Sequence, residues 1–243
     1  MTPRIPRAVY AVSSPQSNTI SLASLTTPTS LVVTMNATEA CKQIHELLET
    51  LPKRDASLEH LPSSGIYFFY EVEEHCPHTG QLRIVRVGTH AAGRTLKRRL
   101  RDHYQGNREG SVFRKHLGTA LIKRAGASDE QIRSWRRKRK GNTCWTQFTK
   151  VEDEVDDIIR STFVFRVMPM DRVQERKWFE EKLIATIAAC PVCQASSTWL
   201  GRFAWSEKVR RSGLWNSQFI DSPTRLTAND LLRLRQLVQT NES

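Results

Sequence analysis

Two short stretches of aromatic and β-branched residues constrain the fold of this chain most. Residues 65–72 (GIYFFYEV) and 82–87 (LRIVRV) have the composition of β-strands. Residues 77–80 (PHTG) lie between them and have the composition of a turn. The two stretches therefore predict an antiparallel hairpin, and residues 162–168 (TFVFRVM) predict a third strand.

Helical periodicity surrounds the expected strands. Apolar residues recur at helical spacing after Asn36, after Thr95 and after Ser111, and each of these three polar residues is a good N-cap. Asp171, with Gln174 as capping partner, predicts the start of a long helix that ends near residue 189. The fold class expected is α+β, a small three-stranded antiparallel sheet flanked by helices, with helical N- and C-terminal extensions.

The first 34 residues differ in composition from the rest of the chain. They contain Arg4 and Arg7, no lysine and no acidic residue, and many Ser and Thr. Such a segment buries too little apolar surface to offset its chain entropy. We interpret the segment as a tail upstream of the folded chain, or as the result of a start codon assigned before Met35. An organelle-targeting signal is the less favoured alternative. We expect a disordered tail at 1–34, an N-terminal helix at 35–61, a main domain at 62–190 with a basic and acidic insertion near 126–157, and a C-terminal extension at 191–243.

The charge balance points to an anionic partner. The chain has 37 Lys and Arg against 25 Asp and Glu, a formal net charge of +12, and nucleic acid is the leading candidate. The basic run at 136–140 either contacts phosphates or pairs with the acidic block at 152–157. The longest apolar stretch falls well short of the roughly 20 residues that span a bilayer, so we expect neither an integral membrane protein nor a membrane partner.

Cysteine usage indicates a reducing compartment. Five cysteines in 243 residues do not resemble a disulfide framework, and we expect a cytoplasmic location. Cys190 and Cys193 form a C-x-x-C pair that could bind zinc together with Cys76 and His78. Because there is no second C-x-x-C pair, buried reduced thiols are the preferred interpretation.

One glutamate lies on the apolar side of the long helix. At about 100° per residue, Phe179, Leu183 and Ile187 define an apolar arc that includes Glu180 and excludes Glu181. A carboxylate facing a core is paired, protonated or bound to a metal. The alternative to a functional role is an intrahelical ion pair with Arg176.

Two further polar groups stand out near the expected hairpin. Arg99 and His103 are four residues apart and share one edge of an apolar helix face, where a rigid guanidinium suits phosphate binding. Tyr67 lies on the first strand, and its phenol can exchange a proton. The alternative interpretations are a solvated basic helix face for Arg99 and an aromatic core position for Tyr67.

These residues together resemble the GIY-YIG nuclease superfamily. Residues 65–67 spell the first half of the family name, and the second half corresponds to residues 86–88, where the second strand ends. The L-x-x-R-L pattern at 96–100 resembles the helix that carries the family's arginine and selects Arg99. His103 falls where members often have His or Tyr. Residues 179–184 (FEEKLI) resemble the segment that carries the family's metal-binding glutamate, and they select Glu180.

The resemblance covers about residues 62–190, and a largely uncharacterised bacterial subgroup looks closer still. Residues 86–90, 107–114 and 212–216 resemble sequence motifs that recur in this subgroup. Two positions depart from the family pattern. Arg86 replaces the second motif tyrosine, and the asparagine that follows the glutamate in many members is absent, for which Asn216 is a candidate substitute.

The resemblance implies a metal-dependent nuclease that hydrolyses phosphodiester bonds in nucleic acid, with DNA expected, by one-metal in-line attack of water. The cofactor implied is Mg²⁺ or Mn²⁺, held by Glu180. Arg99 would stabilise the transition-state charge, and Tyr67 with His103 would handle the proton of the attacking water. The side chains expected to contact nucleic acid are Arg86, Arg94, Lys97, Arg108, Arg114 and Asn216.

Two other functions stay open on the sequence alone. The same fold could be a catalytically inactive nucleic-acid-binding module, as the replacement of the motif tyrosine by Arg86 would allow. A protein-interaction or zinc module built around Cys190 and Cys193 is the second alternative.

Overall fold

The structure is a computed structural model that describes residues 35–137 and 148–240. The tail expected at 1–34 and the last three residues of the basic run at 136–140 lie outside the described residues.

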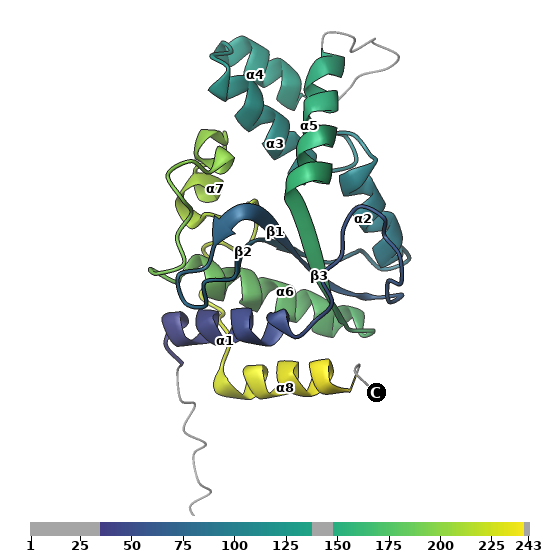
Figure 1. The fold of residues 1–243 in the computed structure, drawn as a ribbon, viewed down its shortest axis with the longest axis vertical. Coiled ribbons are helices and arrows are strands. Elements are labelled where there is room, and N and C mark those ends of the chain that lie inside the picture. The colour runs from purple at the N-terminus through teal and green to yellow at the C-terminus, as the bar shows by residue number, and fades with distance from the viewer. Residues whose placement is uncertain (1–34, 138–147, 241–243) are drawn as a thin grey trace, which may run out of the picture. The chain divides into compact units, whose positions relative to one another are not determined.

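The described chain contains a three-stranded antiparallel sheet, as expected. Strand β1 (Gly65–His75) pairs with β2 (Leu82–Gly88) on one side and with β3 (Phe163–Pro169) on the other, which gives the order β2-β1-β3 (Figure 1). Tyr67 lies opposite Gly88 on β2 and opposite Val167 on β3. The fold class is therefore α+β, as the sequence predicted.

Helices cover both faces of the sheet. In the view of Figure 1, α1, α6 and α8 lie below the sheet, and α3, α4 and α5 lie above it. The helices and the 3-10 turn of the described residues are α1 (Ala37–Glu49), α2 (Leu96–Tyr104), α3 (Val112–Arg124), α4 (Asp129–Arg136), α5 (Thr149–Thr162), α6 (Val173–Ala188), η2 (Leu200–Phe203), α7 (Glu207–Ser212) and α8 (Ala228–Gln239).

Two apolar cores result, one on each face of β1. Ile66 and Phe68 belong to a core shared with α1, α6 and α8, whereas Tyr67 and Phe69 belong to a core shared with α2, α3 and α5. Successive side chains of a strand point to opposite faces. A central strand covered on both faces therefore has a continuous apolar run at its start, which is the composition seen in residues 65–70.

The helix starts agree with the sequence at three of four places. The side chains of Asn36, Thr95 and Ser111 each accept a backbone N–H from the first turn of α1, α2 or α3. The expectation for Asp171 is wrong, because α6 has Arg172 at its N-cap position and no side-chain cap. The carbonyl of Asp171 accepts a hydrogen bond from the Arg176 guanidinium at 2.7 Å, a contact that fixes the segment before the helix but leaves the first N–H groups of α6 without a side-chain acceptor.

The C-terminal residues pack into both cores. Trp199 and Trp215 belong to the core of α2, α3 and α5, and Leu231 and Leu234 of α8 belong to the core of α1 and α6. The expected domain boundary near residue 190 remains a prediction. In the described ranges, none of the helices has the length and apolar character that a membrane crossing requires.

Candidate active site

One pocket brings together three of the four residues expected to be catalytic. Tyr67 from β1, Arg99 from α2 and Glu180 from α6 all line a cavity of about 190 Å³. These residues are far apart in the sequence, so the convergence is produced by the fold. The remaining lining residues are Arg86, Thr89, Val112, Ile184, Asn216, Ser217, Gln218 and Phe219.

The fourth residue, His103, lies behind Tyr67 rather than in the pocket wall. Its Nε2 is 2.9 Å from the Tyr67 hydroxyl, and its Nδ1 is 2.8 Å from Ser111 Oγ. Tyr67 and His103 are both fully buried. A neutral imidazole has one N–H and one bare nitrogen, so this chain of three groups can pass a proton from Tyr67 toward Ser111 or back.

The surroundings of His103 keep its imidazole neutral. Burial, and then the positive charges of Arg99, Arg86 and Arg114, hold the pKa of His103 well below its usual range. A neutral imidazole can accept the proton of the Tyr67 hydroxyl, which an imidazolium cannot do. The pair therefore has the protonation state that a base in contact with a phenol requires.

Two glycines permit the position of Tyr67. A Cβ atom at Gly88 would lie 2.3 Å from the Tyr67 hydroxyl oxygen, and a Cβ atom at Gly65 would lie 2.6 Å from the Met168 carbonyl oxygen. Both distances are shorter than any real contact of a Cβ atom. The glycines at 65 and 88, which the family motif contains, are thus required by close approach of β1 to its two neighbouring strands.

Glu180 is half-buried in the pocket wall. Burial raises the pKa of Glu180, and the charge of Arg86, the backbone N–H of Thr89 and the charge of Arg99 oppose that rise. The alternative partner, Arg176, is directed elsewhere, since its guanidinium donates to the carbonyls of Met170 and Asp171. Glu180 therefore faces the pocket and not the intrahelical ion pair considered from the sequence.

Two arginines line the same pocket as Glu180. Arg99 is partly exposed and donates a long hydrogen bond of 3.4 Å to the Gly110 carbonyl. Arg86 is buried, donates to the Trp215 carbonyl at 2.6 Å and lies over the Phe113 ring. The residue that replaces the second motif tyrosine thus adds a positive charge to the pocket.

Asn216 lines the pocket, but its polar atoms are engaged. Its side-chain oxygen accepts the Val87 N–H at 3.0 Å, and its side-chain nitrogen donates to the Val87 carbonyl at 2.9 Å. This two-point contact attaches the C-terminal segment to the end of β2. The geometry is that of a residue that positions the pocket wall.

The other arginines and the lysine expected to contact nucleic acid fall into two groups. Arg94 and Lys97 are exposed, and Arg94 forms an ion pair with Asp102. Arg108 and Arg114 are buried. The structure therefore gives Arg108 and Arg114 a different environment from the surface position that we expected.

The contacts of the two buried arginines are with the acidic block at 152–157. Arg114 contacts Glu152 at 3.0 Å and Asp156 at 2.5 Å, and Arg108 lies 3.8 Å from Glu152. The acidic block, considered from the sequence as a partner of the basic run, thus pairs here with arginines that precede and begin α3.

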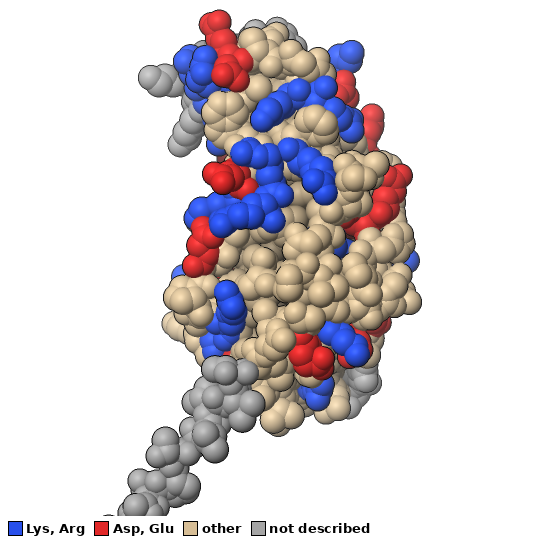
Figure 2. All heavy atoms as spheres, turned by 90° about the vertical axis from the view of Figure 1, so that its left-hand side faces the viewer, with Lys and Arg blue, Asp and Glu red and all other residues tan. Residues whose placement is uncertain are grey.

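A basic face includes a second hollow, which shares no lining residue with the pocket. Figure 2 shows Lys and Arg gathered on the upper part of one side of the molecule, with a few acidic residues among them. Arg133, Arg136 and Arg137 line a shallow hollow with Trp205, and the Arg136 guanidinium lies over the Trp205 ring. Cations interleaved with an exposed aromatic ring are typical of surfaces that bind single-stranded nucleic acid.

Two polar groups of the site, Ser111 and Thr89, carry only a weak signal in the sequence. Ser111 was recognised only as a helix cap, although it also contacts His103. Thr89 was not singled out, although its hydroxyl donates to the Gly65 carbonyl at 2.9 Å and its amide faces Glu180. A Ser or Thr beside a motif glycine is a weak signal, because such residues are common in turns.

A comparison with family models supports the motif reading. The model described as the GIY-YIG domain matches residues 36–243, most of the chain. The chain belongs to the GIY-YIG family. Neither the curated proteins nor the solved structures gave a significant match. GIY-YIG domains are generally endonucleases that act on nucleic acid and use divalent metals.

The residues of the pocket fit such a metal. Glu180 offers a carboxylate in a cavity that solvent reaches, and hard divalent cations prefer oxygen ligands while keeping several waters. Within the described residues, Glu180 forms no salt bridge. A bound cation would stabilise the charged form of a half-buried carboxylate that has no ion-pair partner.

Proposed function

We propose that this GIY-YIG protein is a metal-dependent endonuclease that hydrolyses phosphodiester bonds of DNA by attack of water. The observation that carries the proposal is the pocket of about 190 Å³ lined by Tyr67, Arg99 and Glu180. A base, a cation and a metal-binding carboxylate in one cavity are the groups that in-line phosphoryl hydrolysis needs.

Each residue has a separate task in the proposed reaction. Glu180 holds Mg²⁺ or Mn²⁺ in the pocket, and the cation, when bound, neutralises charge on the phosphate and on the leaving oxygen. The Arg99 guanidinium donates to the non-bridging oxygens, on which charge accumulates in the transition state. Arg86 adds a second positive charge to the pocket wall.

Tyr67 orients the attacking water and takes its proton. Once the anionic phosphodiester offsets the charges of Arg99 and Arg86, the Tyr67 hydroxyl passes its own proton to His103 across the 2.9 Å contact, and Ser111 holds the other side of the imidazole. In this proposal His103 is a positioning and proton-accepting group behind the catalytic tyrosine, because it lies outside the pocket wall.

Cleavage of supercoiled plasmid tests the proposal. The wild-type chain should nick or linearise the plasmid with Mg²⁺ or Mn²⁺ and not with chelator. Glu180→Gln should lower the rate on the order of 10³-fold, since the neutral amide no longer anchors the cation. Glu181→Gln is the matched control, because Glu181 is the next residue and contacts Ser222 instead of the pocket. Full activity of Glu180→Gln would contradict the proposal.

The second candidate function is a nucleic-acid-binding module without catalysis. Arg86 in place of the second motif tyrosine, together with the basic face around Trp205, favours it. Binding of this kind needs no metal and weakens steeply with salt. Salt-sensitive retention of the plasmid without cleavage under any metal condition would select this function over the nuclease.

A further inference from the structure

Four of the five cysteines converge at one place outside the nuclease pocket. Cys41 lies on α1, Cys76 follows β1, and Cys190 and Cys193 follow α6. All four are buried and free. Two histidines, His45 and His78, lie among them. Segments separated by more than a hundred residues thus bring sulfur and imidazole ligands together.

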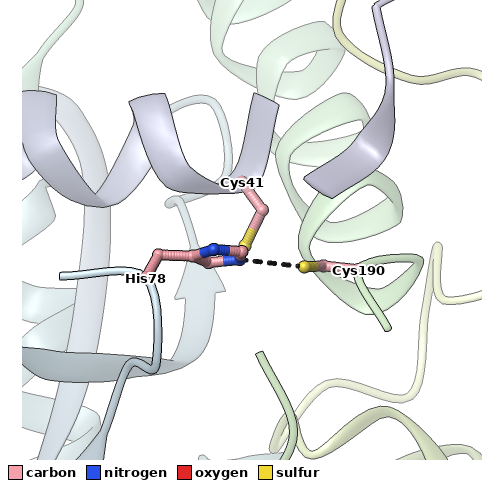
Figure 3. A group of neighbouring side chains, drawn as sticks. All are labelled: Cys41, His78 and Cys190. Atoms are coloured by element: carbon pink, nitrogen blue, oxygen red, sulfur yellow. Dashed lines mark hydrogen bonds between the residues drawn. The ribbon is translucent and has the colours of Figure 1, made fainter. Parts of the chain in front are cut away.

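Three of these side chains form a tight group (Figure 3). The His78 Nε2 atom is 3.2 Å from Cys190 Sγ, and the ligand atoms of Cys41, His78 and Cys190 all lie within 4.8 Å of one another. In a tetrahedral zinc site, Zn–S and Zn–N bonds of about 2.3 and 2.0 Å place neighbouring ligand atoms about 3.5–3.8 Å apart. The group is therefore close to the geometry of three zinc ligands.

Cys193 is the candidate for the fourth ligand. Its Sγ lies within 4.8 Å of Cys41 Sγ but not of both His78 and Cys190, so its side chain must turn toward the ion to complete the set. Its backbone N–H donates to Cys190 Sγ at 3.4 Å, a contact that stabilises a thiolate at Cys190. Cys76 contacts the group through Cys193, with the two sulfurs 3.8 Å apart.

His45 supports the group without a free nitrogen to bind metal. Its Nδ1 is 2.9 Å from the Cys41 carbonyl oxygen, and its Nε2 accepts the Ile84 N–H at 3.2 Å. Both ring nitrogens are thus used by the backbone, while the ring contacts the Cys193 sulfur at 3.8 Å. His45 is a residue that positions the ligands.

We propose that Cys41, His78, Cys190 and Cys193 bind one structural zinc ion, which connects α1, the hairpin turn and the end of α6. Soft thiolates with one imidazole select Zn²⁺ over the hard cations that suit Glu180. The site is separate from the nuclease pocket, because Cys190 lies beyond the end of α6 at Ala188, and Ala188 is eight residues from Glu180, about 12 Å along the helix. Only His78 is partly exposed, so metal enters from its side.

Metal analysis of the full chain tests this site without any nuclease assay. Protein produced with zinc in the medium and transferred to metal-free buffer should contain one zinc per chain. Cys41→Ser and Cys190→Ser should each lose it, whereas Cys76→Ser and Glu180→Gln should keep it. Wild-type protein free of zinc and unable to take up zinc or Co²⁺ would overturn the site. Loss of zinc in Cys76→Ser with retention in Cys193→Ser would overturn the fourth ligand.

Two measurements on the wild-type chain cover the case in which a variant fails to fold. Co²⁺ taken up by the zinc-free protein should give the intense visible bands of a tetrahedral site with thiolate ligands. Removal of zinc by a chelator should lower the melting temperature by about 5–10 °C, because zinc binds only the folded chain. An unchanged melting temperature with octahedral cobalt bands would contradict the proposal.

Discussion

At the scale of single residues, the contact with His103 distinguishes Tyr67, the proposed catalytic tyrosine, from an ordinary core aromatic. Tyr70 on the same strand has an equally buried hydroxyl, but that hydroxyl has no hydrogen-bond partner. Residue type and burial are therefore the same at both positions. The difference lies in the imidazole and the pocket that Tyr67 alone reaches.

This difference predicts the outcome of two matched substitutions. Tyr67→Phe should lower the cleavage rate about 10²–10⁴-fold, because it removes the group that exchanges a proton with water while keeping the ring. Tyr70→Phe should leave the rate unchanged, because its hydroxyl serves no partner. Plasmid cleavage under one set of metal conditions compares the two, and equal rates for both variants would remove Tyr67 from the mechanism.

The raised pKa of Glu180 predicts how the rate depends on pH. Metal binds the carboxylate and not the carboxylic acid, so the rate should fall as the pH decreases through the pKa of Glu180, above its ordinary value of 4.5. More Mg²⁺ competes with the proton and should move this decrease to lower pH. Rate profiles at two Mg²⁺ concentrations test the prediction. Profiles that coincide at both concentrations would assign the decrease to another group.

At the scale of elements, buried arginines connect α3 to the acidic start of α5. Arg114 donates to the His103 carbonyl and pairs with Glu152 and Asp156, so it joins α2, α3 and α5. Burial of the Arg114 charge costs solvation free energy, and the attraction of its acidic partners offsets that cost. The structural role of Arg114 thus differs from that of the exposed Lys97 on α2.

Two alanine variants distinguish these roles. Arg114→Ala should lower the free energy of unfolding by about 3–5 kcal/mol, because it leaves acidic groups beside an empty buried position. Lys97→Ala should leave the free energy of unfolding unchanged. If Lys97 contacts a phosphate, the variant should also reduce the slope of the logarithm of the DNA-binding constant against the logarithm of salt concentration by about one unit. Urea unfolding and binding at several salt concentrations measure both. A stable Arg114→Ala protein with weakened DNA binding would contradict this assignment.

At the scale of the whole molecule, the last fifty residues complete both cores and the pocket. Trp215 belongs to one core, α8 to the other, and Asn216 attaches its segment to the backbone of Val87 at the end of β2. A chain that ends at residue 190 would expose apolar surface on both faces of the sheet.

We therefore expect the chain ending at residue 190 to lose cooperative folding. Circular dichroism during thermal unfolding should show a broad, noncooperative change in place of the single transition of the full chain. A truncated chain that melts cooperatively and still cleaves DNA would support an independent domain at 62–190, as the sequence pattern predicted.

The sequence by itself determined the strands, the starts of α1, α2 and α3, and the identity of the motif residues. These features depend on residues close together in the chain: strand composition at 65–72, N-cap side chains such as Thr95 and Ser111, and a glutamate on an apolar helix face. The glycines at 65 and 88 were readable as a motif, although the close approach that requires them involves neighbouring strands.

Only the tertiary structure decided which charged side chains face solvent and which groups meet. The local sequence does not distinguish Arg108 and Arg114 from the exposed Arg94. They are nevertheless buried, because α5 supplies their acidic partners. The four converging cysteines depended in the same way on how α1, the hairpin and α6 pack. Burial and long-range contacts arise from the packing of distant segments, and no local pattern of residues encodes them.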